Sequence, residues 1–347
     1  MRAIAAYLVF FFHFNPFPTT LLGRLAAQGH IGVTIFFVLS GFLIPFRYAD
    51  QVTLSRHWLT NYFRNRVARI YPLYALLTVI TFSMMWGNPL MSPSWQHQDA
   101  ASPWAMLLLN LTFLRGFFEQ LKYTGIAQGW TLTVEECFYA FAPLLLVLLA
   151  KRRTKYPVLL AAAGGLPAVG YALVRLAPHP LGFFESSHFM FTYTFFGRAF
   201  EFMAGAALAF FVQQHPQVRR GAWATGIGAA WIVGSMCALS YLPAQQEADA
   251  LNLAISSLWL PLGVALFFYG LITEKTWLRT LLATPVAQVL GKSSYAFYLV
   301  HLGVFELTIR QRIIDHTYVL FVIILGLALL LWKWVEEPLN QWLRAGR

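Results

Sequence analysis

Charged side chains are scarce in this sequence. Only 11% of its 347 residues are Asp, Glu, Lys or Arg, which is less than half of the roughly 25% usual in soluble domains. Hydrophobic residues make up 58% of the chain, and the mean hydropathy is +0.58. This composition excludes an intrinsically disordered chain and indicates an integral membrane protein.

Cysteine is almost absent, and so are several motifs that mark common active sites. The two cysteines, Cys137 and Cys237, lie in apolar stretches, so we interpret them as packing residues and not as a disulfide or a metal site. The sequence has no nucleophile elbow, no Walker loop and no zinc-like ligand spacing. No metal cofactor is therefore predicted. A clean small-x-small cleavage site is also missing after the first apolar run, which favours a first membrane span over a signal peptide.

Acidic residues are outnumbered by basic ones, 14 against 25. The basic residues are spread over several loops, so no nucleic-acid partner is predicted. Most of them fall in loops that are expected on the same side of the membrane as the N-terminus. The positive-inside rule then places both termini in the cytoplasm.

Apolar runs of about 20 residues, the length needed to cross a bilayer, recur along the whole chain. They fall at 3–20, 31–46, 69–86, 130–150, 156–175, 190–213, 221–242, 252–273, 290–309 and 317–335. We predict an all-α polytopic membrane helix bundle of about ten transmembrane helices, N-in and C-in. It would form one domain over 1–347, with no appended soluble domain. The shorter run 104–114 is expected to be interfacial or re-entrant.

One histidine interrupts the first apolar run. His13 lies eleven residues after Arg2, which on a helix brings both to one face, within about 20° of three full turns. The two would be about 16 Å apart along the axis, so His13 is expected near the middle of the bilayer if Arg2 is at its surface. A histidine in hydrocarbon needs a partner or a function, and His13 is the candidate for proton transfer.

An arginine pair follows in "NYFRNRVARIYPLY". Arg66 and Arg69 are three residues apart, on one face of a helix entering the membrane, and two guanidiniums one turn apart suit phosphate groups. The alternative is ordinary anchoring by positive charge on the cytoplasmic side.

Other polar residues inside apolar runs allow two interpretations each. Glu135 and its neighbour Glu136 begin a span and could cap its helix, or belong to a site. His301 is a site histidine or a packed one. Glu336 is expected at a helix C-terminus, where its charge opposes the helix dipole and so requires a cationic partner or a function.

A further pair, Arg198 and Glu201, is three residues apart in "GRAFEFMAG". We interpret it as a neutralising buried pair and not as a catalytic one.

Taken together, these segments resemble the acyltransferase-3 family of membrane O-acyltransferases over nearly the whole chain. The motifs are Arg2-Ala3 with His13, then "GHIGVTIFFVLSGFLI", "RVAR" followed by Ile-Tyr-Pro, "WTLTVEECFY", "SYAFYLVHL" and "VEEP", in that order. Family members usually have several residues before the arginine, an aspartate among them, whereas this chain has only Met1. A start codon further upstream would explain that difference.

The resemblance implies transfer of a short acyl group, commonly acetyl, from cytoplasmic acyl-CoA to a hydroxyl of a cell-envelope or secreted carbohydrate or glycolipid. His13 matches the family's catalytic histidine, and Glu336 falls where the family has a functionally important glutamate. The remaining matches are the three arginines proposed to hold the donor: Arg2, Arg66 and Arg69. Glu135 and His301 lie in two of the motifs, and we expect them to contact the substrate. The expected location is the inner (cytoplasmic) membrane.

The chemistry fits a buried imidazole. A sugar hydroxyl is a poor nucleophile at neutral pH, and a positioned base typically contributes about 10²–10⁴-fold. We expect His13 to act as that general base, with a carboxylate such as Glu336 orienting the ring, as in serine–histidine–aspartate triads. Direct transfer is favoured, and an acyl-histidine intermediate stays open. The alternative is a transporter or flippase for an envelope glycan or lipid intermediate, although paired broken helices typical of transporters are missing.

Overall fold

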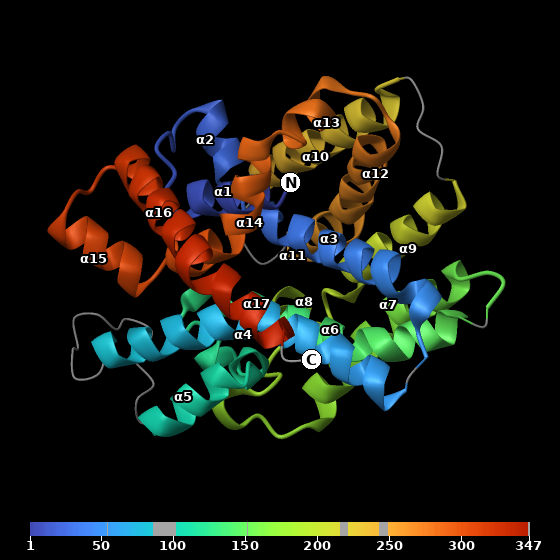
Figure 1. Ribbon diagram of the computed structural model, residues 1–347, viewed down its shortest axis with the longest axis horizontal. Coiled ribbons are helices and arrows are strands. Elements are labelled where there is room, and N and C mark those ends of the chain that lie inside the picture. The colour runs from blue at the N-terminus through green and yellow to red at the C-terminus, as the bar shows by residue number, and fades with distance from the viewer. Residues whose placement is uncertain (54, 86–101, 151, 216–220, 243–248, 346–347) are drawn as a thin grey trace. The chain divides into compact units, whose positions relative to one another are not determined.

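The described part of the chain is mostly helical. The computed structural model describes residues 1–53, 55–85, 102–150, 152–215, 221–242 and 249–345 (Figure 1). Within these residues there is no β-strand, only an isolated antiparallel bridge between Phe118 and Phe183. The prediction of an all-α protein is confirmed.

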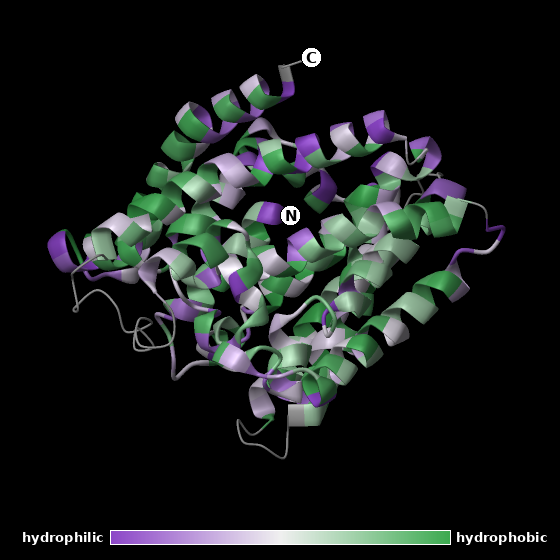
Figure 2. Cartoon of the chain, turned by 90° about the horizontal axis from the view of Figure 1, so that it is seen from below, coloured by the Kyte–Doolittle hydropathy of each residue, from purple (hydrophilic) through white to green (hydrophobic). Residues whose placement is uncertain are grey.

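Seven helices are long and apolar enough to cross a membrane, counting only the described residues. They span Ile31–Gln51, Arg56–Met85, Ala127–Ala150, Tyr156–Leu176, Trp223–Tyr241, Ala250–Thr273 and Thr317–Arg344. Figure 2 shows the long hydrophobic stretches along most helices. Two shorter apolar helices are Arg2–His13 and Ala199–Gln214. A multi-pass helical membrane protein is thus confirmed, whereas the count of about ten and the N-in, C-in orientation stay predictions.

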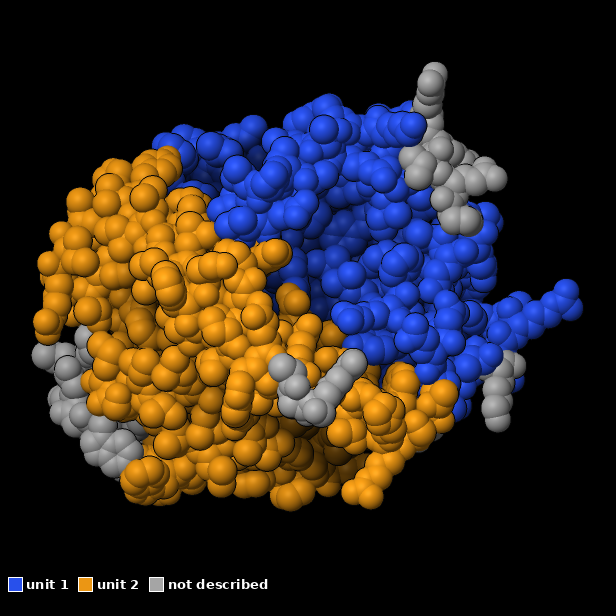
Figure 3. Space-filling view, in the orientation of Figure 1, with its two compact units in different colours: residues 1–52, 142–168, 196–291 blue, residues 53–141, 169–195, 292–347 orange. Residues whose placement is uncertain are grey.

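The chain divides into two compact units, each made of three separate stretches (Figure 3). Unit 1 comprises residues 1–52, 142–168 and 196–291, and unit 2 comprises 53–141, 169–195 and 292–347. Three helices contribute residues to both units: α6 (Trp130–Ala150), α7 (Tyr156–Leu176) and α14 (Pro285–Val300).

In unit 1, helices α3 (Ile31–Tyr48) and α9 (Ala199–Gln214) pack so closely that their backbones are in contact. The other elements of unit 1 are α1 (Arg2–His13), α2 (Leu21–Ala26), η1 (Ala49–Gln51), α10 (Trp223–Tyr241), α11 (Asp249–Ala254), the π-helix η9 (Ile255–Trp259), α12 (Leu260–Thr273) and α13 (Trp277–Leu282). A Cβ on Gly41 would lie 2.2 Å from the Phe202 carbonyl oxygen, and one on Gly205 would lie 2.1 Å from that of Val38. Only glycine therefore permits the α3–α9 contact, as is common between membrane helices.

Unit 2 is held by side chains that donate to backbone carbonyls. Its other elements are α4 (Arg56–Met85), α5 (Pro103–Leu111), η4 (Leu114–Phe117), η5 (Glu119–Leu121), η6 (Ala127–Gly129), η7 (Pro180–Gly182), α8 (Ser187–Tyr193), α15 (Val304–Arg312), α16 (Thr317–Leu331), the π-helix η10 (Trp332–Glu336) and α17 (Glu337–Ala345). The Gln128 side chain donates to the carbonyls of Tyr298 and Leu299, at 2.7 and 2.8 Å. It thereby satisfies carbonyls that the end of α14 leaves free.

Three of the predicted spans are wrong as continuous helices. The run 290–309 is broken between α14 and α15 at Gly303, whose φ of 98° a non-glycine residue rarely adopts. The run 190–213 contains extended backbone at Thr194, so its helix α9 begins only at Ala199. The run 3–20 ends early, at His13. The short run 104–114 forms a short helix, α5, and its interfacial or re-entrant position stays a prediction.

Candidate functional site

Helix α1 ends at His13 because the following residues form a turn. Asn15 precedes Pro16, and a residue before proline is disfavoured in the helical region. The Asn15 amide instead donates to the Gly23 carbonyl at 2.7 Å, and its oxygen accepts from the Phe17 N–H at 3.0 Å. His13 is therefore the last helical residue and not a residue in the middle of the first helix, as hydropathy had indicated.

The two predicted site residues of unit 1 are at the two ends of α1. Arg2 opens the helix, and its buried Nε makes no hydrogen bond with the described residues. The His13 side chain is exposed, and its ring lies 4.9 Å from that of Phe12, centroid to centroid. A second histidine, His30, is 5.6 Å from the same Phe12 ring. An exposed imidazole at a helix end is sterically open to a substrate.

The arginine pair lies within α4, in unit 2, one helical turn apart. The Arg66 guanidinium lies 5.5 Å from the centroid of the Tyr139 ring, a cation–π distance. It also interacts electrostatically with Glu136, and Arg69 does so with Glu336. Unit 2 thus brings both arginines beside carboxylates that are distant in sequence.

Glu135 and Glu136 do not cap their helix. Helix α6 begins at Trp130 and has no acidic residue in its first turn, which does not support the interpretation as a cap. Glu135 instead accepts a hydrogen bond from the Tyr139 hydroxyl one turn later. The two carboxylates interact electrostatically with each other, and Glu136 also with Arg66. They belong to the same polar cluster as the arginine pair.

Glu336 is not at a helix C-terminus, contrary to our expectation. The π-helix η10 joins α16 directly to α17, so the helix continues past Pro338. The expected cationic partners are nevertheless present: Arg69 for Glu336, and Lys333 for Glu337 at 3.1 Å. The Glu336 Oε2 atom is buried and accepts no hydrogen bond from the described residues. π-Helical turns of this kind are frequently found at functional sites.

His301 is fully buried just after α14. Its Nδ1 is 2.8 Å from the Tyr298 carbonyl oxygen, and its ring stacks on that of Phe297 at 6.1 Å. These contacts are all within one turn of its own chain segment, as in a packed histidine. Its expected role in substrate binding stays a prediction.

Sequence reasoning missed four residues of unit 2 that connect the arginine-bearing helix to its neighbours. The Tyr295 hydroxyl donates to the Ile70 carbonyl at 2.8 Å, and the Asn340 amide donates to that of Ala68 at 3.1 Å. The other two are Tyr139, which lies beside Arg66, and Tyr62, which donates to the Tyr139 carbonyl. The prolines that interrupt α4 and α6 were the available signal, since each leaves a carbonyl without its helical partner.

The predicted neutralising pair in unit 1 is confirmed. Arg198 Nε donates to Glu201 at 2.8 Å, and Thr34 donates to the other carboxylate oxygen at 2.8 Å. Arg198 is 7% exposed and Glu201 is fully buried. Both oxygens of this carboxylate therefore accept a hydrogen bond, as expected of a neutralising buried pair.

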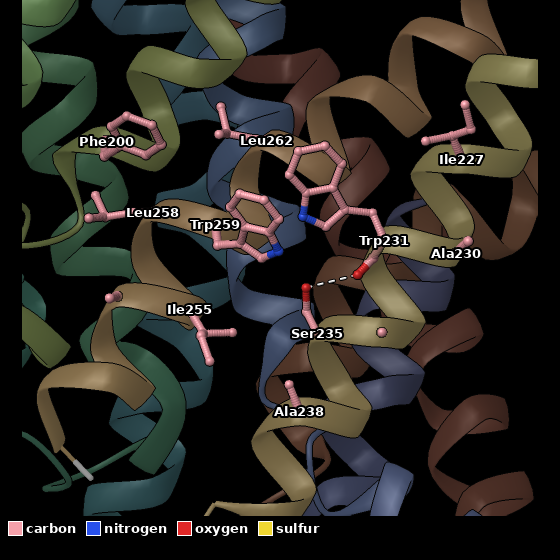
Figure 4. A pocket seen from close by; sticks show the side chains of 12 residues that line it. Phe200, Ile227, Ala230, Trp231, Ser235, Ala238, Ile255, Leu258, Trp259 and Leu262 are labelled. Atoms are coloured by element: carbon pink, nitrogen blue, oxygen red, sulfur yellow. Dashed lines mark hydrogen bonds between the residues drawn. The ribbon is translucent and has the colours of Figure 1, made fainter. Parts of the chain in front are cut away.

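Unit 1 also contains a cavity of about 820 Å³ with apolar walls. Trp231 and Trp259 line it side by side, with 4.5 Å between their ring centroids, and Phe200 and Leu258 form part of its lining (Figure 4). Ser235 contributes a hydroxyl, which donates to the Trp231 carbonyl at 2.8 Å. With no ionisable side chain in its lining, this cavity does not supply acid–base chemistry.

Neither cysteine forms a disulfide: Cys137 and Cys237 are free, as predicted. Among the residues that the structure describes, no group of three or more His, Cys, Asp or Glu side chains could hold a metal ion.

Comparison with known proteins gives one family and several relatives. A family model described as an acyltransferase domain matches residues 1–335. The peptidoglycan O-acetyltransferase OatA of Listeria monocytogenes is 24% identical, over 89% of this chain and 49% of that protein. The O-acetyltransferase OatA of Staphylococcus aureus is 26% identical over 44% of this chain and 24% of its own length.

A putative O-acetyltransferase of S. aureus is 23% identical over 98% of this chain and 56% of its own length. The chain thus spans about half the length of the relatives that it matches most fully. No solved structure matches the chain.

Proposed function

Because this chain belongs to the acyltransferase family whose model covers residues 1–335, we propose that it is a membrane O-acyltransferase. It moves a short acyl group, acetyl in the first instance, from cytoplasmic acyl-CoA to a hydroxyl of a cell-envelope carbohydrate or glycolipid. The observation that carries this proposal is the polar cluster of unit 2, in which Arg66 and Arg69 lie beside Glu136 and Glu336 on three long apolar helices. Charged groups within membrane spans mark functional sites by default.

The arginines are suited to the phosphates of the donor. CoA carries phosphate groups, which bind best to guanidiniums that present several N–H donors in a fixed fork. Arg66 and Arg69 supply two such forks one turn apart on α4. Arg2, with a buried Nε that makes no hydrogen bond to the described residues, is the third proposed donor ligand. The donor then arrives from the cytoplasmic side, consistent with the proposed N-in, C-in orientation in the cytoplasmic membrane.

His13 is the proposed general base. Its neutral imidazole accepts the proton of the acceptor hydroxyl while that oxygen attacks the thioester carbonyl carbon. The tetrahedral intermediate then collapses, the carbon–sulfur bond breaks, and the proton passes from the imidazolium to the CoA thiolate. The products are an ester and free CoA thiol. The exposed position of His13 at the end of α1 leaves room for both substrates.

Three further residues have proposed roles. Glu336 is the carboxylate proposed to stabilise the imidazolium, following the logic of catalytic triads. Glu135 and His301 are proposed substrate contacts. The class of acceptor is suggested by the relatives, one of which is named a peptidoglycan O-acetyltransferase.

The test uses the full chain purified into lipid nanodiscs, with [¹⁴C]acetyl-CoA as donor and soluble peptidoglycan fragments as acceptor. Release of CoA thiol and transfer of label to the sugar are measured for the wild type, H13A and H57A. His57 is the matched control, since it is an exposed histidine on α4 that contacts Asn61. We expect H13A to lose at least about 100-fold in transfer rate, at unchanged yield, while H57A is unaffected.

Two results would count against the proposal. Transfer retained by H13A would reject the base assignment. A wild-type protein that releases no CoA thiol, yet moves a fluorescent lipid-linked sugar across the bilayer, would favour a flippase.

A further inference from the structure

The segment of α4 that carries the arginines makes two unusual hydrogen bonds with other helices. In an α-helix the carbonyl of residue i accepts from the N–H of residue i+4, and proline has no N–H. Pro72 therefore leaves the Ala68 carbonyl without its helical partner. The Asn340 amide, from α17, donates to this oxygen at 3.1 Å. Ala68 lies between Arg66 and Arg69, so the bond is made at the arginine pair itself.

A second carbonyl freed by a proline is satisfied by a side chain one turn before Arg66. Pro143 interrupts α6 and leaves the Tyr139 carbonyl free. The Tyr62 hydroxyl, one turn before Arg66 on α4, donates to this oxygen at 3.0 Å. Tyr62 is 1% exposed, and the ring of Tyr139 is the one beside the Arg66 guanidinium.

Both carbonyls would otherwise be costly. A backbone acceptor in an apolar interior that lacks a donor loses a full hydrogen bond, and no water is present in hydrocarbon to replace it. The donors could have come from residues within the same helix. They come instead from the arginine-bearing helix and from the helix of Glu336, since Glu336 and Asn340 are four residues apart on one face.

We propose that Tyr62 and Asn340 are positioning residues, whose hydrogen bonds to the two proline-freed carbonyls fix how Arg66 and Arg69 are presented to the donor. Tyr295, which donates to the Ile70 carbonyl, reinforces the same segment. This inference rests on the proposed role of the arginines in binding acyl-CoA. The two prolines then have a function that hydropathy does not reveal. Each leaves a backbone carbonyl free to accept a hydrogen bond from a neighbouring helix, and these bonds hold the arginine-bearing part of α4 in place.

A double-mutant cycle tests the bond at Ala68. P72A restores an N–H to the Ala68 carbonyl, so the helix can satisfy that oxygen without Asn340. The four proteins are the wild type, N340L, P72A and P72A/N340L, in nanodiscs. The Kd for CoA is measured by calorimetry, and thermal stability by intrinsic fluorescence. Q341L, on an exposed neighbour of Asn340, is the matched control.

We expect N340L to weaken CoA binding about tenfold, because the Ala68 carbonyl loses its donor and the arginine segment is no longer held in place. The effect should be much smaller in the P72A background. Q341L should match the wild type. Y62F, which removes only the hydroxyl, should weaken CoA binding in the same sense, and that effect should shrink when combined with P143A.

The outcomes separate the possible failures. Additive effects of N340L and P72A on thermal stability would show that the bond has no energetic role, and would overturn the proposal. Coupling in stability with unchanged CoA affinity would also overturn it, because the bond would then serve packing alone. If the wild type binds no CoA, the donor-binding part of the proposed function fails and the positioning role fails with it, whereas the stability cycle still reports on the bond.

Discussion

Carboxylates with buried oxygen atoms can be compared directly between the two units, because each unit holds one beside an arginine. In unit 1, Glu201 receives hydrogen bonds on both oxygens, from Arg198 and Thr34. In unit 2, Glu336 interacts electrostatically with Arg69, yet its Oε2 accepts no hydrogen bond from the described residues. The residue types are the same, and the degree to which each carboxylate is satisfied differs.

We propose that this difference separates a structural charge from a functional one. A buried ion pair with every lone pair satisfied rigidifies its surroundings, and its charges are not available to a ligand. A buried polar atom left without a partner requires an explanation, and a catalytic or binding role is one of them. In unit 1, the fully hydrogen-bonded Glu201 links α3 to α9. In unit 2, Glu336, incompletely hydrogen-bonded within the described part of the chain, lies beside one of the arginines proposed to bind the donor.

The largest effect is expected from the same substitution in both units. E201Q removes the partner of a buried guanidinium, which costs about 3–5 kcal/mol of stability. We expect a low yield of folded protein and a Tm lowered by several degrees. E336Q should leave Tm close to the wild-type value and lower the acetyl-transfer rate at least tenfold. Thermal unfolding in detergent and the radiolabel assay measure the two quantities on the same preparations.

Similar effects of E201Q and E336Q on Tm and on the transfer rate would contradict the proposed difference between the two carboxylates. If E336Q unfolds as readily as E201Q, then Glu336 is structural too. If E201Q folds normally and only transfer falls, the Arg198–Glu201 pair belongs to the reaction.

An intermediate effect is expected from the arginine pair. R66Q and R69Q each remove one guanidinium from the proposed phosphate site, and we expect KM for acetyl-CoA to rise about tenfold, in the range of a lost charged hydrogen bond. The maximal rate should change less. R64Q is the control, because Arg64 bonds Asn61 at 2.9 Å on the same helix. An unchanged KM in both variants, or an equal rise in R64Q, would argue against donor binding.

Local patterns in the sequence predicted which segments are helical better than they predicted the residues at which the helices end. The spacing of Arg66 and Arg69 gave their common helix correctly. The sequence Asn15-Pro16 also indicates that the first helix ends near His13. The prediction missed this end because the apolar run continues beyond it and the span was assigned from hydropathy. The break at Gly303 was missed for the same reason, since glycine is tolerated in apolar runs and only its φ marks the turn.

The contacts of the site needed the fold. Pro72 and Pro143 imply from sequence alone that the carbonyls of Ala68 and Tyr139 are free. No local rule identifies the donor to Ala68, because Asn340 is 272 residues away. The π-turn that keeps Glu336 within a continuous helix was equally unreadable, since its residues are ordinary helix formers.

The smallest effect is expected where unit 1 satisfies a second carboxylate. Glu274 follows α12 and accepts from the N–H groups of Ala224 and Thr225 and from the Thr225 hydroxyl, at 2.6 to 2.9 Å, so it caps the start of α10. Burial acts to raise the pKa of Glu274, but the hydrogen bonds from Thr225 and Ala224 outweigh it and leave the pKa below its ordinary value of 4.5. The ionised carboxylate is thus the stabilising form.

E274Q should cost about 1 kcal/mol at pH 7, typical of a lost helix cap. Because the folded pKa is depressed, the wild-type advantage is present above the ordinary pKa and is lost as pH falls through the folded value. The Tm difference between wild type and E274Q should therefore shrink steadily below pH 4.5. A Tm difference that stays constant as the pH falls well below 4.5 would mean that the charge of Glu274 contributes nothing to stability. Unit 1 would then not depend on the hydrogen bonds that its ionised carboxylate accepts.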